Sequence, residues 1–298
     1  MYKLLNANFY KLKKDTTFWL FLFISIGIAL ITIFRYKFMS SLDISLDRVL
    51  CEFIWIIGLF ISIFVSIFVG KEHSYGVIRN KIVTGCSRNN IYLSNLFISI
   101  IASIICVITY ILITYFVGGL FFGELQMNSY QLILIILNTI LIIIAYCTIF
   151  NFITMLSSEI TISTIICTLL FISMFIICSG FSTTVNANKY IESRVINENG
   201  ESIIERIPNP NYPSELKMEI AKTIYYTLPV GSAQEIQTAS STFDFFNSNN
   251  IDSVSLTTLK ESQNENFSNL QTSLSYLITL IIFLNFVGIF IFNKKELK

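Results

Sequence analysis

The chain has 298 residues, of which 54% are hydrophobic and only 13% are charged. Because an average soluble protein carries about 25% charged residues, this composition excludes an ordinary soluble enzyme and indicates a helical membrane protein. The formal net charge of +1 provides no basic field for a nucleic acid, so we expect no nucleic-acid partner.

The first 16 residues precede any apolar span and carry a helical pattern. Met1, Leu5, Phe9 and Leu12 recur at helical spacing, while the lysines occupy other positions. This pattern predicts a cytoplasmic helix that lies along the inner surface of the membrane. The alternative is a basic flank that only fixes the orientation of the first span.

Six apolar stretches are long enough to cross a bilayer as helices, which takes about 20 residues each. They cover Thr17–Phe34, Phe53–Val69, Ile91–Val117, Leu132–Leu156, Ile160–Phe181 and Leu274–Phe292. Residues 17–181 therefore hold the first five spans, and residues 273–298 hold the sixth span and a cytoplasmic tail. The third stretch could instead end in a re-entrant element, because Gly118, Gly119 and Gly123 loosen its backbone.

Lysine and arginine in the short connections predict the orientation of the spans. Eleven of them lie in the N-terminal segment, in the loop after the second span and in the C-terminal tail, against three in the short connections on the other side. Because basic residues stay on the cytoplasmic side, we expect both termini in the cytoplasm.

The polar segment 182–272, between the fifth and sixth spans, is then extracellular. Residues 192–196 and 201–207 flank the sequence Asn197–Gly200 like two strands around a turn. Ser214 is a suitable N-cap for a helix that ends near Pro229. We expect a small mixed α/β extracellular domain here, with a mobile stretch at residues 247–266. The predicted fold class is an all-α membrane protein carrying this one insertion.

The residues that enzymes use are missing from the sequence. His73 is the sole histidine, no His-Glu-x-x-His pair exists for a zinc protease, and no Gly-x-x-x-x-Gly-Lys loop exists for a nucleotide. We therefore expect that this chain is not an enzyme, that it has no catalytic residue and that it binds no metal or cofactor. If ATP drives the protein, another chain binds it.

The spans contain no charged residue but several small or polar ones. These are Ser62, Ser66, Asn138, Thr161, Thr164 and Thr168. Small residues at four-residue spacing let helices approach closely, so helix packing is one interpretation. The other is that these side chains line a path for an amphiphilic substrate.

The loop at residues 70–90 has more order than a basic connector needs. Tyr75, Ile78 and Ile82 fall on one helical face, and Arg79 and Lys81 are free to face water. An apolar stripe on a short cytoplasmic helix predicts a partner with a matching groove.

At this loop the chain resembles the membrane subunits of ABC-2-type ABC transporters. The pattern of a glutamate, a glycine four residues on, a basic helix and then Gly-x-Ser-Arg is carried by Glu72, Gly76, Ile78, Arg79, Asn80, Lys81, Gly85, Ser87, Arg88, Tyr92 and Ser94. A second similarity, to such permeases of low-GC Gram-positive bacteria, is carried by the sequences Asn209–Tyr212 and Leu228–Gly231.

This resemblance implies a six-span ABC-2 (type V exporter-like) fold and a coupling helix that contacts a separate cytoplasmic ABC ATPase. It assigns coupling to Glu72, Tyr75, Gly76, Ile78, Arg79, Lys81, Ile82, Gly85 and Arg88. It also implies ATP and Mg²⁺ on the ATPase, a second permease chain as homodimer or heterodimer partner, and export of an amphiphile such as a peptide antibiotic or a lipid-like molecule. The alternative function is a membrane-anchored sensor or assembly protein that binds a ligand outside and recruits a cytoplasmic partner through the basic loop.

Overall fold

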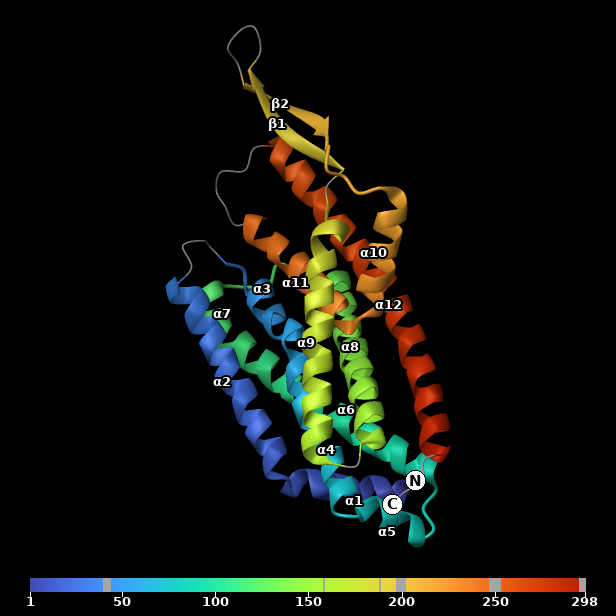
Figure 1. Cartoon of the computed structure of the whole chain (residues 1–298). Coiled ribbons are helices and arrows are strands. Elements are labelled where there is room, and N and C mark those ends of the chain that lie inside the picture. The colour runs from blue at the N-terminus through green and yellow to red at the C-terminus, as the bar shows by residue number, and fades with distance from the viewer. Residues whose placement is uncertain (40–43, 158, 188, 197–201, 247–252, 295–298) are drawn as a thin grey trace.

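The fold was obtained as a computed structural model, which describes all residues except 40–43, 158, 188, 197–201, 247–252 and 295–298. It consists of helices and one two-stranded hairpin (Figure 1). The elements are α1 (Tyr2–Lys14), α2 (Thr16–Met39), α3 (Leu46–Cys51), η1 (Glu52–Trp55), α4 (Ile57–Ser74), α5 (Val77–Val83), α6 (Arg88–Ile113), the π turn η2 (Thr114–Gly118), α7 (Gly119–Phe122), α8 (Ser129–Leu156), α9 (Ile160–Val185), β1 (Tyr190–Ile196), β2 (Ser202–Pro208), α10 (Glu215–Thr227), α11 (Pro229–Phe246) and α12 (Ser253–Lys294).

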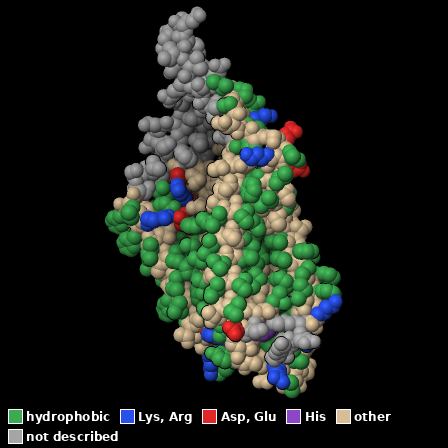
Figure 2. Space-filling model, viewed as in Figure 1, with side chains coloured by type: hydrophobic (Ala, Val, Ile, Leu, Met, Phe, Trp, Pro, Cys, Tyr) green, Lys and Arg blue, Asp and Glu red, His purple; other side chains and the backbone are tan. Residues whose placement is uncertain are grey.

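All six predicted spans are confirmed as helices that are long and apolar enough to cross a membrane. They occupy Thr16–Met39, Leu46–Ser74, Arg88–Phe122, Ser129–Leu156, Ile160–Val185 and Ser262–Lys294. Figure 2 shows hydrophobic side chains over the middle of the visible face and charged side chains near its two ends. This distribution is that of a multi-pass membrane protein.

The third span is helical to its end, and the alternative of a re-entrant element there does not occur. The helix continues from Arg88 through η2 and α7 to Phe122. It ends at Gly123, whose φ of +81° is a conformation that side chains rarely adopt. Gly123 therefore marks the end of this helical segment, and Gly118 and Gly119 lie within it.

The second and fourth spans form the centre of the bundle. In their most apolar stretches 67% and 61% of the residues are buried, against at most 39% in the other four spans. α4 packs against α8 and α9, α8 packs against α12, and α2 packs against α6. At Gly58 a Cβ atom would lie 2.5 Å from the rings of Tyr146 and Phe171. The helices at the centre of the bundle therefore pack too closely at this position for any side chain.

The segment between the fifth and sixth spans does not form the expected separate α/β domain. The hairpin is confirmed in part: β1 and β2 pair antiparallel with Tyr190 opposite Pro208 and Ile196 opposite Ser202, while the predicted turn lies outside the described residues. The hairpin projects from the bundle (Figure 1), whereas α10 packs on α9, and α11 packs on α3, α8 and α12.

The reason for this difference is an apolar stripe on α11. Val230, Ala233, Ile236 and Ala239 recur at helical spacing and are fully buried. We expected residues 247–266 to be mobile, but the described part of this stretch is helical, because Ser253 begins the 42-residue helix α12. Residues 247–252 lie outside the described residues.

One end of the bundle gathers the basic elements. α1, α5 and the end of α12 lie there, and the hairpin lies at the opposite end (Figure 1). α1 is a helix as expected, but its buried residues are Leu4, Asn8 and Leu12, which pack toward α6. The exposed side of α1 carries Tyr2 and Tyr10 together with lysines.

Candidate functional site

The carboxylate of Glu72 is the centre of a polar network at the basic end of the bundle. Glu72 lies in the last turn of α4, and its side chain is 1% exposed. Its Oε1 atom accepts from the Nζ atoms of Lys81 at 2.8 Å and Lys11 at 3.2 Å, and its Oε2 atom accepts from Asn95 Nδ2 at 2.7 Å. These three partners come from α5, α1 and α6. Four helices therefore meet at one carboxylate.

Asn8 of α1 extends the network. Its Nδ2 atom donates to Asn95 Oδ1 at 2.7 Å and to Ser94 Oγ at 3.2 Å, and its Oδ1 atom accepts from Lys81 Nζ at 3.0 Å. Lys11 also donates to the carbonyl of Phe68 at 3.0 Å. Buried polar groups that satisfy one another in this way fix a single arrangement of the elements that carry them.

The charges in this network depend on each other. Burial lowers the pKa of the Lys11 ammonium, and attraction to Glu72 opposes only part of that change. Removal of one partner from a buried ion pair typically destabilises a protein by about 3–5 kcal/mol, because the remaining charge is left without compensation. The network therefore resists separation of α5 from α4.

A second ion pair fixes the corner between α1 and α2. Lys71 Nζ lies 3.1 and 3.2 Å from the two carboxylate oxygens of Asp15. Asp15 also accepts from Thr17 N at 2.8 Å and from the Thr17 hydroxyl. Burial acts to raise the pKa of Asp15, but the hydrogen bonds from Thr17 and Lys71 outweigh it and hold the pKa below its usual value.

The short helix α5 is bounded by two glycines. Gly76 and Gly85 have φ values of +67° and +87°, which favour glycine. The turn at Gly76 separates α5 from α4 and lets Lys81 return to Glu72, nine positions earlier in the chain.

The three residues of the apolar stripe predicted on α5 do not share one exposed surface. Ile78 is 2% exposed and Ile82 is half-buried against the core, whereas Tyr75 is 72% exposed. Lys81 was expected to face water, but its side chain is only 14% exposed because it reaches Glu72. The inward face of α5 therefore holds the helix in place.

The outward face of this segment is formed by different residues. Tyr75, Arg79 and Val83 are exposed. Arg79 and Val83 are four residues apart on α5 and lie along one side of that helix, and Tyr75 precedes the turn at Gly76. Asn80 and Thr84 are exposed beside them. We call Tyr75, Arg79 and Val83 the outward triad.

The first residue of α6 touches the end of the sixth span. Arg88 Nη1 donates to the carbonyls of Phe292 at 3.3 Å and Asn293 at 3.1 Å. A basic side chain at the C-terminal carbonyls of a helix is favourable. Further along α6, the Tyr92 hydroxyl lies against Gly288, where an added Cβ would be 2.5 Å from it.

The residues that sequence reasoning offered as a substrate path do not meet in one cavity of the described structure. Ser62 and Ser66 are fully buried and donate to their own helix at the carbonyls of Leu59 and Ile63. Asn138 joins α8 to α12, because it donates to the carbonyl of Leu270 at 3.2 Å and accepts from Ser273 at 2.8 Å.

The three threonines of the proposed path lie on α9. Thr161 is exposed, and Thr164 and Thr168 are half-buried. The hydroxyls of Thr164 and Thr168 donate to the helix backbone at 2.8 Å. Like Ser62 and Ser66, Thr164 and Thr168 therefore satisfy their hydroxyls within their own helix.

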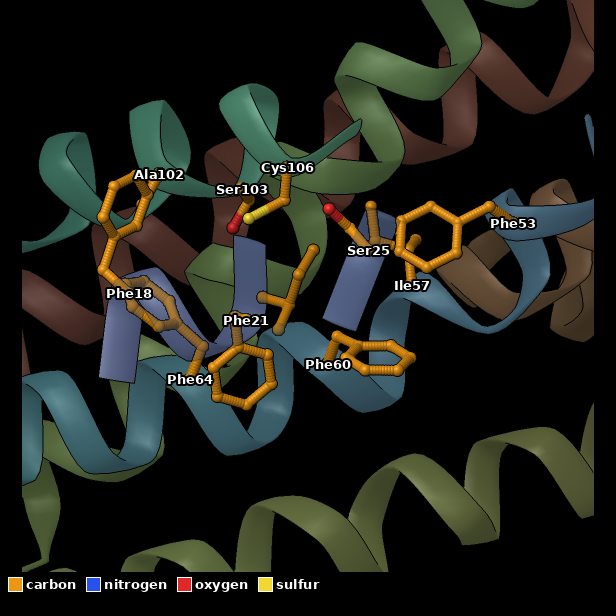
Figure 3. A pocket seen from close by; sticks show the side chains of 11 residues that line it. Phe18, Phe21, Ser25, Phe53, Ile57, Phe60, Phe64, Ala102, Ser103 and Cys106 are labelled. Carbon is orange, nitrogen blue, oxygen red and sulfur yellow. The ribbon is translucent and has the colours of Figure 1, made fainter. Parts of the chain in front are cut away.

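An aromatic gap lies between α2, α4 and α6 (Figure 3). Phe18, Phe21, Phe60 and Phe64 surround it, with Ala102 to Cys106 on the other side. Its volume is ≈ 20 Å³, about the space of one water molecule, and its walls are apolar. This volume is too small for a substrate molecule, so we interpret it as a packing gap between spans.

At the hairpin end, two carboxylates hold α11 against the spans. Glu52 accepts from Arg35 at 2.6 Å, Tyr36 at 2.9 Å and Gln237 at 3.0 Å. Asp244 pairs with Arg48 at 2.6 Å. Sequence reasoning missed both groups, since their partners come from α2, α3 and α11.

Glu235 on α11 has a different environment. Its side chain is fully buried, and neither carboxylate oxygen has a hydrogen-bond partner within the described structure. Burial raises its pKa to about 7, which the charge of Lys222 opposes in part and the charge of Glu265 reinforces. The carboxyl group is therefore mostly neutral below about pH 7 and mostly charged above it.

Within the described residues, no group of three or more histidine, cysteine, aspartate or glutamate side chains could hold a metal ion. No family model matches the chain, and no curated protein matches its sequence. The features of the described structure that bear on function are therefore the Glu72 network and the outward triad.

Proposed function

We propose that this chain is the membrane-spanning permease subunit of an ABC-2-type exporter, with the outward triad as the contact for a separate cytoplasmic ATPase. The observation that carries the proposal is the division of α5 into two faces. One face is locked to the spans through Glu72, and the other is exposed with a mixed apolar and basic character.

The exposed face suits a protein partner. Tyr75 and Val83 are 72% and 80% exposed, and Arg79 forms no ion pair among the described residues. Tyrosine and arginine are enriched among the residues that dominate protein interfaces. Their presence at the basic end agrees with a cytoplasmic location, because most of the basic residues of the short connections lie at this end.

The face of α5 that is locked to the spans can transmit a movement of α5 to the membrane-spanning helices. A displacement of α5 would be transmitted to α4 and α6 through the Glu72 network, and the Arg88 contact connects the start of α6 with α12. These are the ends of the second, third and sixth spans. A transporter needs two arrangements of its spans that bind substrate differently, and a rigidly joined set of helix ends can shift together between them.

The remaining parts of the machine would come from other chains. The sequence has no phosphate-binding loop, so ATP and Mg²⁺ would bind to the ATPase. A second permease chain, identical or different, would complete the path. The cargo class is an amphiphile, and the location is the plasma membrane of a bacterium with both termini in the cytoplasm.

The test is purification of the tagged chain from its native membrane in mild detergent, with identification of co-purifying proteins and measurement of ATP hydrolysis. The proposal expects a protein with nucleotide-binding motifs at a fixed ratio, and loss of that protein with Arg79→Glu but not with Leu216→Glu on α10. Leu216 is the matched control because it is 70% exposed on α10. Recovery of a histidine kinase without an ATPase would instead support the sensor alternative.

A further inference from the structure

A larger cavity lies between α3, α6 and α8. Its volume is ≈ 400 Å³, and its walls are almost entirely apolar. Ile54, Ile104, Ile108, Ile136 and Ile140 are among the lining residues. It shares no residue with the aromatic gap of Figure 3.

This cavity opens on the surface that faces the bilayer. Ile108 and Ile136, on two neighbouring spans, are 49% and 45% exposed, and both line the cavity. Water does not fill an apolar cavity of this kind, because it would lose hydrogen bonds there. An empty cavity would leave the lining atoms without contacts on one side. Hydrocarbon from the bilayer is the medium that can fill it.

The end of the cavity nearest the hairpin is closed. Leu125 and Met127 line it, and the loop that carries them is held by Asp47, which accepts from the backbone N–H groups of Gln126 at 3.0 Å and Met127 at 3.1 Å. Because these two N–H groups already bind the Asp47 carboxylate, it does not need a charged ligand as a partner. An occupant has to enter sideways from the membrane.

The dimensions fit one lipid chain. Along α8 the lining runs from Leu132 to Ile143. At 1.5 Å per residue this is about 17 Å, close to the ~15 Å depth of one leaflet of a ~30 Å hydrocarbon core. A helix of a second protein chain is about 10–12 Å across, so a cavity of this size would hold only about one turn of it.

We propose that this cavity binds one acyl chain of a phospholipid from the leaflet at the hairpin end of the protein. The lipid would be a resident ligand between the third and fourth spans. The proposal does not depend on the ATPase or on transport.

The experiment uses the full chain in phosphatidylcholine vesicles that contain a phospholipid with a photoreactive diazirine on its acyl chain. After illumination, mass spectrometry maps the labelled residues. We expect a severalfold excess of label on the lining residues of α6 and α8 over Leu169 and Ile172 of α9, which are equally lipid-facing at 60% and 46% exposure but line no described cavity.

A cavity-filling variant sharpens this comparison. Ile140→Trp should remove the excess label, and Ile172→Trp on α9 should leave it unchanged. Labelling of α6 and α8 at the level of α9 in the unmodified chain would overturn the proposal, even if Ile140→Trp fails to fold. Cross-links between two copies of the chain through Ile108 and Ile136 would overturn it as well, since they would identify a protein interface.

Discussion

Glu235→Gln should stabilise the protein above neutral pH. The folded pKa of Glu235 is about 7, against an ordinary value of 4.5. The folded protein therefore holds a proton that the unfolded chain releases between these pH values, and stability falls as pH rises from 4.5 to 7. At about 1.36 kcal/mol per pKa unit, the loss is on the order of 3 kcal/mol above pH 7. Glutamine, which does not ionise, avoids this loss.

The assay is thermal unfolding of the purified chain in detergent between pH 4.5 and 8.5. At roughly 2–4 °C per kcal/mol, the variant should unfold several degrees higher than the unmodified chain at pH 8 and at the same temperature near pH 4.5. Glu219→Gln on the exposed side of α10 is the matched control and should change little. Parallel pH profiles for Glu235→Gln and the unmodified chain would refute the reasoning, and with it the burial of α11 within the bundle.

Three further predictions follow from the packing and the orientation. Lys81→Met should destabilise the chain by about 1.5–3 kcal/mol, because a hydrogen bond to the buried charge of Glu72 is lost. In thermal unfolding, the double variant Lys81→Met/Glu72→Gln should lose less stability than the sum of the losses of the two single variants. Gly58→Ala should destabilise by about 1–3 kcal/mol through overpacking, whereas Gly27→Ala, where nothing lies within 4 Å, should be neutral in the same assay. In a Cys86→Ser background, a membrane-impermeant thiol reagent should label Leu216→Cys in intact cells and Val83→Cys only after permeabilisation.

Each of these has an outcome that contradicts it. Additive effects of Lys81→Met and Glu72→Gln would show that the two side chains do not interact. Equal stability of the two alanine variants would show that the centre of the bundle is looser than described. Labelling of Val83→Cys in intact cells would reverse the orientation.

The spans could be predicted because the signal is local and repeated. A stretch of about 20 apolar residues without charge has few alternatives to a membrane helix, and all six such stretches became helices. The hairpin strands were predicted for a similar reason, since two runs of alternating polar and apolar residues flank a turn sequence. α11 was missed because its apolar stripe is diluted by serine, threonine and glutamine, and composition therefore favoured an extracellular domain.

The Glu72 network could be predicted only in part. Glu72 and Lys81 were assigned to the coupling loop, but their pairing depends on the turn at Gly76, and Lys81 was expected in water. Lys11 is 61 positions from Glu72, and Asn8 interrupts an otherwise apolar face, which is a signal that could have been read as a buried polar contact. Which face of α5 points outward depends on α1 and α6, and a local pattern does not contain that information.

The most direct test of the central proposal is site-specific photo-cross-linking from α5 in native membranes. A photoreactive amino acid at Val83 should form an adduct with a protein that carries nucleotide-binding motifs, and the same group at Ile78, which is buried against the bundle, should cross-link only within the chain. Adducts of Val83 with lipid alone, or with a partner that binds no nucleotide, would contradict the proposed function.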